Sequence, residues 1–281
     1  MKIPVIAGSV PEHPGLEEKL RFYRRKGCLV PPRKIIKTPE QIEGIRESGK
    51  INTALLDHVA AHIREGMSTE EIDKMVYDFT LAHGAIPAPL HYEGFPKSVC
   101  TSVNDQVCHG IPSSGDILKS GDIINVDVST ILNGYFSDAS RMFLIGQVSA
   151  ERQRLVEVTG ECLRLGIEAA KPWGFLGDIG AAIQHHAEKN GYSVVRDFCG
   201  HGVGLKFHEI PEVEHVGKKG TGMLLVPGMV FTIEPMINIG TYEIFIDSDN
   251  DWTVYTEDGC PSAQWEHTIL ITEDGNEILT C

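Results

Sequence analysis

The chain has 281 residues, of which 42% are hydrophobic and 23% charged, as is typical of a globular protein with one large or two small domains. No apolar run approaches the roughly 18 residues that a membrane helix needs, and the opening Met-Lys-Ile-Pro-Val-Ile-Ala-Gly is not a convincing signal peptide. The net charge of −14 disfavours nucleic-acid binding, and seven cysteines without a Cys-x-x-Cys pair favour a reduced, cytoplasmic protein without a disulfide framework or zinc knuckle.

Residues 1–37 are predicted to form an N-terminal arm. Prolines at positions 4, 11, 14, 31 and 32 should prevent long regular structure there. Residues 19–37 hold eight basic side chains and no acid, so this segment carries +8 and the rest of the chain −22 (−14 − 8). The basic segment is either a solvated collar or a docking handle for a partner.

Residues 38–148 are predicted to form two helices followed by strands. Thr38 is a good N-cap, with Pro39 at the first helical position and Gln41 completing a capping box; Gly66 should end the helix. A second capping box at 68–71 opens a helix that runs toward Gly84. Strands are expected at 97–103, 122–131 and 135–145.

Residues 149–281 repeat this order. Helices are expected at about 150–170 and 177–190, and strands near 193–198, 229–236, 243–246, 252–256 and 263–272. The repeat predicts an α+β fold in which two similar halves form one mostly antiparallel sheet with helices on one face. A site would lie where the halves meet.

Asn133-Gly134 predicts a two-residue type I′ hairpin turn. Paired positions would then sum to 267, which puts Asp127 and Asp138 on one face, one diagonal step apart, at roughly 5.5–8 Å between Cβ atoms. On an apolar face this pair needs a cation, because two buried carboxylates repel each other. The alternative is the solvent face of a hairpin, and the pair alone does not decide between the two.

Other acidic and imidazole groups extend this set. Glu234 and Glu266 lie in apolar strand-like segments that carry no lysine or arginine. His201 stands among three glycines, which let backbone approach a ligand closely, and His208 follows seven residues later. Two Asp, two Glu and one His suit two divalent ions of the Mn, Fe, Co or Zn group.

At this point the residues match a known family. From about residue 38 to the end the chain resembles the type I methionine aminopeptidases, which are pita-bread metallopeptidases. The motifs that carry the resemblance are Ser98–Asn104, Cys108–Pro112, Asn125–Asp127, Ser137-Asp138, Gly200–Gly204, Phe231–Met236 and Ser262–Thr268. The resemblance implies a pita-bread fold, a pseudo-twofold duplicated antiparallel sheet with helices on its outer face, in halves of about 38–148 and 149–281.

The resemblance also implies the roles of the site residues. Asp138 and Glu266 would bridge two metal ions, Asp127 would bind one of them, and His201 with Glu234 would bind the other. His109 would steady the scissile peptide, His208 would contact the substrate backbone near its second residue, and Glu234 would relay a proton to the leaving amine.

A methionine pocket follows by the same resemblance, from Tyr92, Phe95, Cys100, Phe207 and Trp252. Aromatic rings and a thiol make a soft, polarisable cup that suits a thioether. Phe95 stands where many members have tyrosine, and Pro89 and Lys206 are atypical near the site. Asn104 and Ser262 match positions that help hold a monovalent cation, Na⁺ or K⁺, in relatives.

The expected activity is therefore that of a cytoplasmic, monomeric hydrolase. It would remove the N-terminal methionine from nascent proteins and peptides when the second residue is small, using a dinuclear metal-activated water. The basic arm could dock on the ribosome, and neither a membrane nor a specific nucleic acid is an expected partner. The rivals are an Xaa-Pro peptidase, which usually has a larger N-terminal domain, and an inactive binding module of the same fold, which typically lacks ligands.

Overall fold

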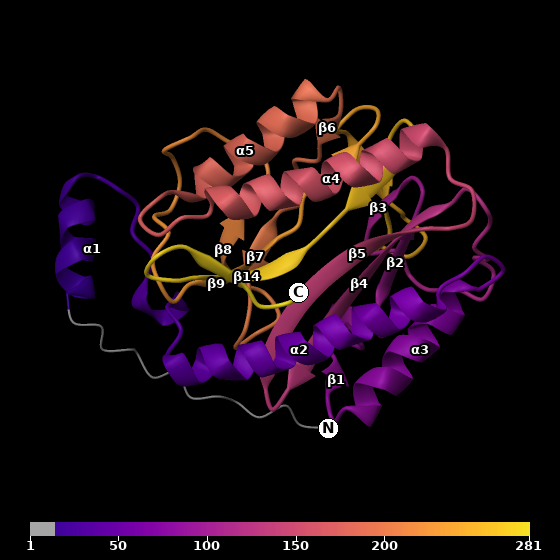
Figure 1. Cartoon of the computed structure of the whole chain (residues 1–281), viewed down its shortest axis with the longest axis horizontal. Coiled ribbons are helices and arrows are strands. Elements are labelled where there is room, and N and C mark those ends of the chain that lie inside the picture. The colour runs from indigo at the N-terminus through magenta and orange to yellow at the C-terminus, as the bar shows by residue number, and fades with distance from the viewer. Residues whose placement is uncertain (1–14) are drawn as a thin grey trace.

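The computed structural model describes residues 15–281. The first half of the domain has two helices and then strands (Figure 1). Both capping boxes form as predicted: Thr38 Oγ1 accepts from the Gln41 N–H, and Ser68 Oγ from the Glu71 N–H. The elements are α2 (Pro39–His62), α3 (Thr69–Ala82), β1 (Ile86–Pro87), η2 (Tyr92–Gly94), β2 (Cys100–Val103), β3 (Gln106–Cys108), β4 (Ile123–Leu132) and β5 (Tyr135–Leu144).

The second half repeats the order of two helices followed by strands, as the sequence predicts. Strands β1, β3, β7, β8 and β15 were not expected. The elements are α4 (Ala150–Ala169), α5 (Leu176–Lys189), β6 (Ser193–Val194), β7 (Gly200–Gly202), β8 (Glu209–Val213), β9 (Val230–Ile233), β10 (Met236–Asn238), β11 (Ile244–Ile246), β12 (Val254–Thr256), β13 (Ser262–Gln264), β14 (His267–Ile271) and β15 (Asn276–Ile278).

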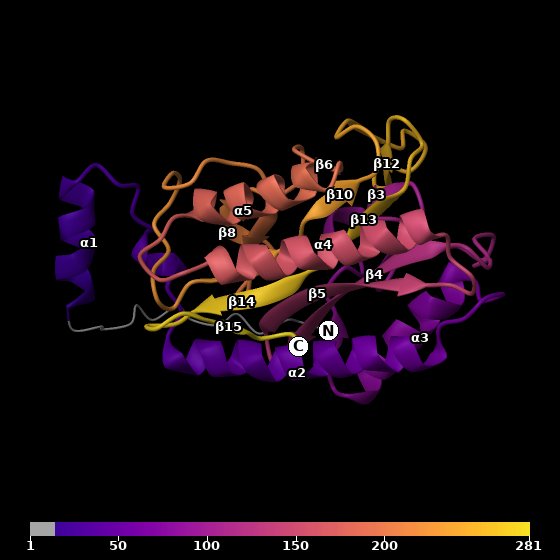
Figure 2. The ribbon, with the colours of Figure 1, turned by 45° about the horizontal axis from the view of Figure 1, so that its top comes forward.

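The strands pair antiparallel, but they form four small sheets where one sheet was expected. These are β1-β4-β2 with β5 beside β4, β13-β10-β6, β11-β12-β3, and β15-β14-β9-β7-β8. The halves meet where the Glu266 N–H donates to the Ser140 carbonyl at 3.2 Å. Helices α2 and α4 lie on the same side of the strands (Figures 1 and 2). The α+β layout is confirmed, and no helix in the described part of the chain is long and apolar enough to cross a membrane.

The β4–β5 hairpin has the predicted register. Leu132 pairs with Tyr135, and Asp127 faces Ser140 while Ser129 faces Asp138, so paired numbers sum to 267 throughout. Both turn residues, Asn133 and Gly134, have positive φ, as a type I′ turn requires. The two aspartates therefore lie one diagonal step apart.

Two predicted strands are each broken at a glutamate. The segment 229–236 splits into β9 and β10 around Glu234, and the segment 263–272 splits into β13 and β14 around Glu266. β9 pairs with β14 and β10 pairs with β13, so both segments pass from one sheet to another at the same place. Pro235 contributes to the break because it has no N–H to donate. The breaks free both carboxylates from a regular strand face.

Helix α2 lies close against the hairpin that carries the aspartates. Ser48 Oγ donates to the Thr130 carbonyl at 3.0 Å, and Asn52 Nδ2 donates to the Val128 carbonyl at 2.6 Å. On the same helix, a Cβ at Gly49 would stand 2.1 Å from the Leu279 carbonyl oxygen, so only glycine allows α2 to approach the segment after β15 this closely. Both polar side chains are fully buried. The contacts hold β4 and β5 rigidly behind the site.

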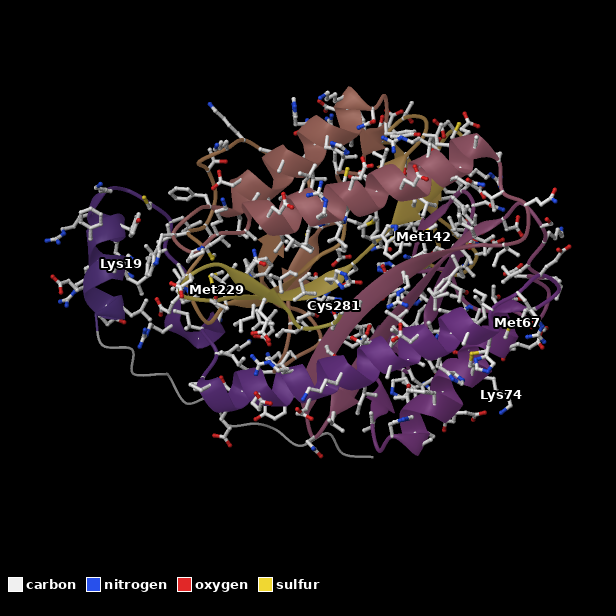
Figure 3. All side chains as sticks on the ribbon, in the orientation of Figure 1. Lys19, Met67, Lys74, Met142, Met229 and Cys281 are labelled. Atoms are coloured by element: carbon white, nitrogen blue, oxygen red, sulfur yellow. The ribbon has the colours of Figure 1, made fainter. Side chains whose placement is uncertain are left out.

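The described part of the arm packs on the second half of the domain. The sequence predicted no long regular structure there, yet α1 (Leu16–Arg25) forms between the prolines, followed by η1 (Arg33–Ile35). Leu20 is buried, and Tyr23 stacks on Trp173 at 5.8 Å. The Lys19 ammonium stands 3.7 Å from the same ring, and Figure 3 shows Lys19 on α1. Residues 1–14, with three of the five prolines, lie outside the described residues.

Candidate metal centre and substrate cavity

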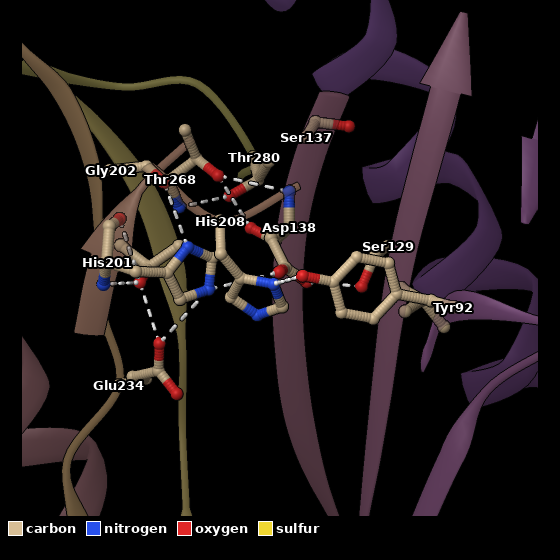
Figure 4. Close-up of polar contacts among 12 residues, drawn as sticks. Tyr92, Ser129, Ser137, Asp138, His201, Gly202, His208, Glu234, Thr268 and Thr280 are labelled. Atoms are coloured by element: carbon tan, nitrogen blue, oxygen red, sulfur yellow. Dashed lines mark hydrogen bonds and ion pairs between the residues drawn. The ribbon is translucent and has the colours of Figure 1, made fainter. Parts of the chain in front are cut away.

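The five predicted ligands line one cavity at the junction of the halves. Figure 4 shows three of them, Asp138, His201 and Glu234. One ligand atom each from Asp138, His201 and Glu266 lies within 4.8 Å of the others. His201 Nε2 is 3.6 Å from Asp138 Oδ2 and 3.7 Å from Glu234 Oε1. Asp127 lines the same cavity. The hairpin, β7 and the two strand breaks therefore each supply part of one cluster.

This cluster is electrostatically incomplete without cations. Asp138 and Glu266 are 4% and 2% exposed. Burial raises the pKa of all four acids, and the neighbouring carboxylates raise it further for Asp138, Glu234 and Glu266. Within residues 15–281 no ion pair joins a lysine or arginine to any of them. Asp127 Oδ1 is buried without a hydrogen-bond donor. An oxygen-rich set of this kind fits divalent metal ions.

His201 is prepared to act as a neutral ligand. Its Nδ1 lies 3.0 Å from the Gly202 carbonyl, which favours a proton there and leaves the Nε2 lone pair toward the carboxylates. Burial is the main cause that lowers the pKa of His201 to about 3. The imidazole is therefore uncharged at neutral pH, the form that binds metal.

A ring of polar side chains holds the ligands, and sequence reasoning missed it. Thr232 Oγ1 donates to Glu234 Oε1 at 2.7 Å, Gln264 Nε2 donates to Glu234 Oε2 at 3.2 Å, and Ser129 Oγ donates to Asp138 Oδ1 at 2.7 Å. Ser129 stands two residues from Asp127, and Thr232 stands two from Glu234. Side chains two apart share a strand face, so this period could have identified them.

The glycines around His201 serve strand packing. A Cβ at Gly200 would stand 2.4 Å from the Thr232 carbonyl oxygen, and one at Gly202 would stand 2.3 Å from that of Ile210. The sequence reading assigned these glycines to close approach of a ligand. In the structure they let β9 and the chain around Ile210 approach β7, which sets the His201 backbone in place.

A cavity of about 610 Å³ opens onto the cluster. Every predicted ligand and pocket residue lines it, including Cys100, His109 and His208. Sequence reasoning missed other lining residues, some beside motifs that it used: Glu93, Asp197, Phe198, Cys199, Glu209, Ile210, Glu212 and Met236, with Ser129. Sequence position was the available signal for three of these residues. Phe198 and Cys199 directly precede the glycine motif 200–204, and Met236 is the last residue of the Phe231–Met236 motif.

The inner wall of the cavity is aromatic. Phe95 packs edge-to-face on Trp252 at 5.2 Å, and Tyr92 packs on Phe207 at 4.8 Å. Cys100 is buried, and burial first of all raises its pKa well above the usual value, so the thiol stays neutral. Phe95, only 2% exposed, presents no hydroxyl. Such a cup suits an unbranched, polarisable side chain.

Two histidines flank the cluster without joining it. His109 has a φ of 56° and packs edge-to-face on Phe198 at 5.5 Å; burial, then His208, lowers its pKa to about 4. His208 Nδ1 is 2.9 Å from the Tyr92 hydroxyl, and its ring lies 4.3 Å from that of His201 (Figure 4). A neutral imidazole can donate one hydrogen bond to a carbonyl.

The remaining predicted residues lie around this core. Ser262 N donates to the Asn104 carbonyl at 2.9 Å, so these two are neighbours. Asn104 Oδ1 already accepts from Arg152 Nη1 at 2.8 Å, and a monovalent cation there would need other oxygens. That cation stays a prediction. Pro89 lines the cavity, whereas Lys206 is exposed outside it.

The chain is similar to known metallopeptidases along most of its length. Residues 43–273 match metallopeptidase family M24. The chain is 57% identical to methionine aminopeptidase A of Synechocystis sp. over 85% of its length and 94% of that protein. The crystal structure of methionine aminopeptidase from Rickettsia prowazekii superposes with a TM-score of 0.86 at 47% identity, covering 88% of this chain and 99% of that one. The prolidase of Pyrococcus horikoshii OT3 shares the fold, with a TM-score of 0.69 at 23% identity over 88% of this chain and 63% of that one.

Proposed function

The chain belongs to metallopeptidase family M24, and on that premise we propose how its pita-bread domain removes the N-terminal methionine from polypeptides whose second residue is small. The observation that carries the proposal is a single cavity that joins five buried or half-buried metal-type ligands to an aromatic cup. We assign the chemistry to residues 38–281 and treat residues 1–37 as an appended arm.

The five ligands would hold two divalent ions. Asp138 and Glu266 would bridge them, Asp127 would complete one, and His201 with Glu234 would complete the other. Ions held by these residues would supply an acidified water and a polarised scissile carbonyl. Thr232 and Ser129 donate hydrogen bonds to the carboxylates of Glu234 and Asp138. These bonds favour the ionised carboxylates, which bind metal, over the protonated acids. Whether the ions are Mn, Fe, Co or Zn is a matter for metal analysis.

The other residues position the substrate. Phe95, Trp252, Tyr92 and Phe207 enclose the methionine side chain, with Cys100 as part of the wall. His109 donates its N–H to the scissile carbonyl region, and His208 contacts the backbone beyond that bond. Glu234 would take up the proton that the attacking water loses and pass it to the leaving amine.

A peptide-release assay tests the function. Methionine should be released from Met-Gly-Gly in the presence of divalent metal, whereas an Xaa-Pro dipeptide should stay intact. Release of the Xaa residue only before proline would favour the prolidase activity instead. If a folded and metal-loaded protein releases nothing with any of the four metals, the result would favour the inactive binding module of the same fold.

His109→Ala should lower kcat by roughly 10²-fold or more, since the imidazole acts mainly in the transition state. Metal affinity should stay unchanged, because His109 is outside the ligand set. Calorimetric titration with Mn²⁺ and kinetics on Met-Ala-Ser measure the two quantities on the same sample. A large loss of metal binding would show that His109 is a ligand.

For the arm we propose electrostatic docking on the ribosome in the cytoplasm, where nascent chains emerge. The exposed residues of α1 and the turn after it include Arg21, Arg24, Arg25 and Lys26. Arg33 pairs with Glu17, and Lys37 pairs with Glu209, so these two are not part of that exposed set. Co-sedimentation with ribosomes should fall steeply with salt and after charge reversal of Arg24 and Arg25. Salt-insensitive binding would argue against docking by the arm.

A further inference from the structure

Lys37 is a fully buried lysine at the end of the arm. Only 1% of its side chain is exposed, and its Nζ lies 2.6 Å from Glu209 Oε2. Its backbone N–H donates to the Gly228 carbonyl at 2.8 Å, directly before the Thr38 N-cap of α2. A buried ammonium is expensive to desolvate, and one ion pair seldom returns more than that cost in stability. A gain in folding stability therefore does not by itself explain why Lys37 and Glu209 form a buried ion pair.

The other oxygen of Glu209 supplies that reason. Glu209 Oε1 accepts hydrogen bonds from the backbone N–H groups of Leu205 at 2.8 Å and Lys206 at 3.1 Å. The carboxylate thus ties the end of the segment 204–209 to its beginning. Lys37 holds one oxygen of Glu209 while the loop holds the other.

This loop carries three residues that line the substrate cavity, Phe207, His208 and Glu209. Phe207 and His208 stack on each other at 4.4 Å, and both pack against Tyr92. The loop begins at Gly204, which has a φ of 133° and whose Cβ would lie 2.4 Å from Ile45 and 3.4 Å from the Lys37 side chain. The loop therefore rests on Lys37 and α2, and its closure depends on Glu209.

We propose that Lys37 is a positioning residue for substrate binding. It acts through Glu209 to hold the loop 204–209 in place and so fixes the orientation of the Phe207 and His208 side chains. The Lys37 side chain does not line the cavity and touches none of the five metal-type ligands in the contacts of the described residues. What the cavity binds rests on the proposed function. The restraint of the loop does not.

Amide hydrogen exchange tests the restraint directly on the metal-loaded full chain. In Lys37→Met the amides of Leu205 and Lys206 should exchange about tenfold faster or more, because their shared acceptor loses its anchor. This readout stands even if the chain proved to lack methionine release. Unchanged protection of both amides in folded Lys37→Met would overturn the proposal.

Kinetics on Met-Ala-Ser then test the consequence. Lys37→Met should raise KM by about tenfold or more, with a smaller change in kcat and unaltered Mn²⁺ affinity, since misplacement of about 1 Å by a remote mutation can cost 10²-fold. If Lys37 acts through Glu209, Lys37→Met/Glu209→Gln should lose no more than the worse single variant. Losses that multiply would overturn the proposal.

Arg46→Met is the matched control, because Arg46 on α2 pairs with Glu277 at 2.9 Å without lining the cavity. It should leave KM unchanged at a temperature where all variants are folded by circular dichroism. If Lys37→Met does not fold, Lys37→Arg and Glu209→Gln take its place. Loop exchange equal to that of the parent chain in both would refute the assignment.

Discussion

Asp138→Asn is expected to abolish methionine release while the fold is retained. The carboxylate of Asp138 faces His201 in the cluster, and an amide cannot supply its charge to two cations. The loss should be roughly 10³-fold or more, as for removal of one member of a catalytic unit. The backbone is held by Thr268, whose Oγ1 accepts from the Asp138 N–H at 3.1 Å and donates to its carbonyl at 2.7 Å, so asparagine should fit. Kinetics and metal titration check the result.

The same variant should be at least as stable as the parent chain once metal is removed. Burial raises the folded-state pKa of Asp127 to about 7, and burial first of all raises that of Glu234 to about 8, both above the unfolded values near 4. The folded chain therefore binds more protons than the unfolded chain between these pH values, and its stability falls as pH rises through that window. Asp138→Asn removes one repelling charge and should flatten this fall.

Urea unfolding of the metal-free proteins from pH 4 to pH 9 measures the free energy of unfolding directly. Asp57→Asn is the matched control, since Asp57 is 66% exposed on α2 and pairs with Arg141. It should alter neither activity nor the pH profile. Full activity of Asp138→Asn, or of a rigorously metal-free parent chain, would refute the two-metal assignment.

Met-Ala-Ser should be cleaved at least about 10²-fold more efficiently than Met-Lys-Ser, measured as kcat/KM. In the proposed function the aromatic cup fixes methionine, so the scissile carbonyl would reach the metal centre only if the next side chain clears the wall. That wall contains His208, whose ring is 4.3 Å from that of His201 and which is bonded to the Tyr92 hydroxyl at 2.9 Å. A displacement of about 1 Å can cost 10²-fold, which sets the expected ratio.

A peptide series separates the two parts of this selectivity. Met followed by Gly, Ala, Ser, Cys, Thr, Pro or Val should be cut, and Met followed by Leu, Lys, Arg or Glu far more slowly. Leu-Ala-Ser serves as the control for the first pocket and should be poorer than Met-Ala-Ser. Equal efficiency for Met-Ala-Ser and Met-Lys-Ser, or faster release of Leu than of Met, would contradict the assignment of the cavity.

Local sequence determined much of this protein. The capping boxes at Thr38 and Ser68 and the Asn133-Gly134 turn act within a few residues, so they could be read directly. The turn also fixed the hairpin register and so the diagonal placement of Asp127 and Asp138. The resemblance to a family added the proposal that His201, Glu234 and Glu266 are ligands, which spacing alone left open.

Tertiary structure decided the rest, because it depends on contacts between residues far apart in the chain. His201, Glu234 and Glu266 meet the aspartates only because two strand pairs break together at the glutamates, and no local propensity announces that break. The helix in the arm is held by packing against Trp173, and the charges of Lys37 and Glu209, 172 positions apart, meet in a buried pair. Sequence patterns encode the period of a strand or helix, but burial and pairing over such distances exist only after the chain has folded.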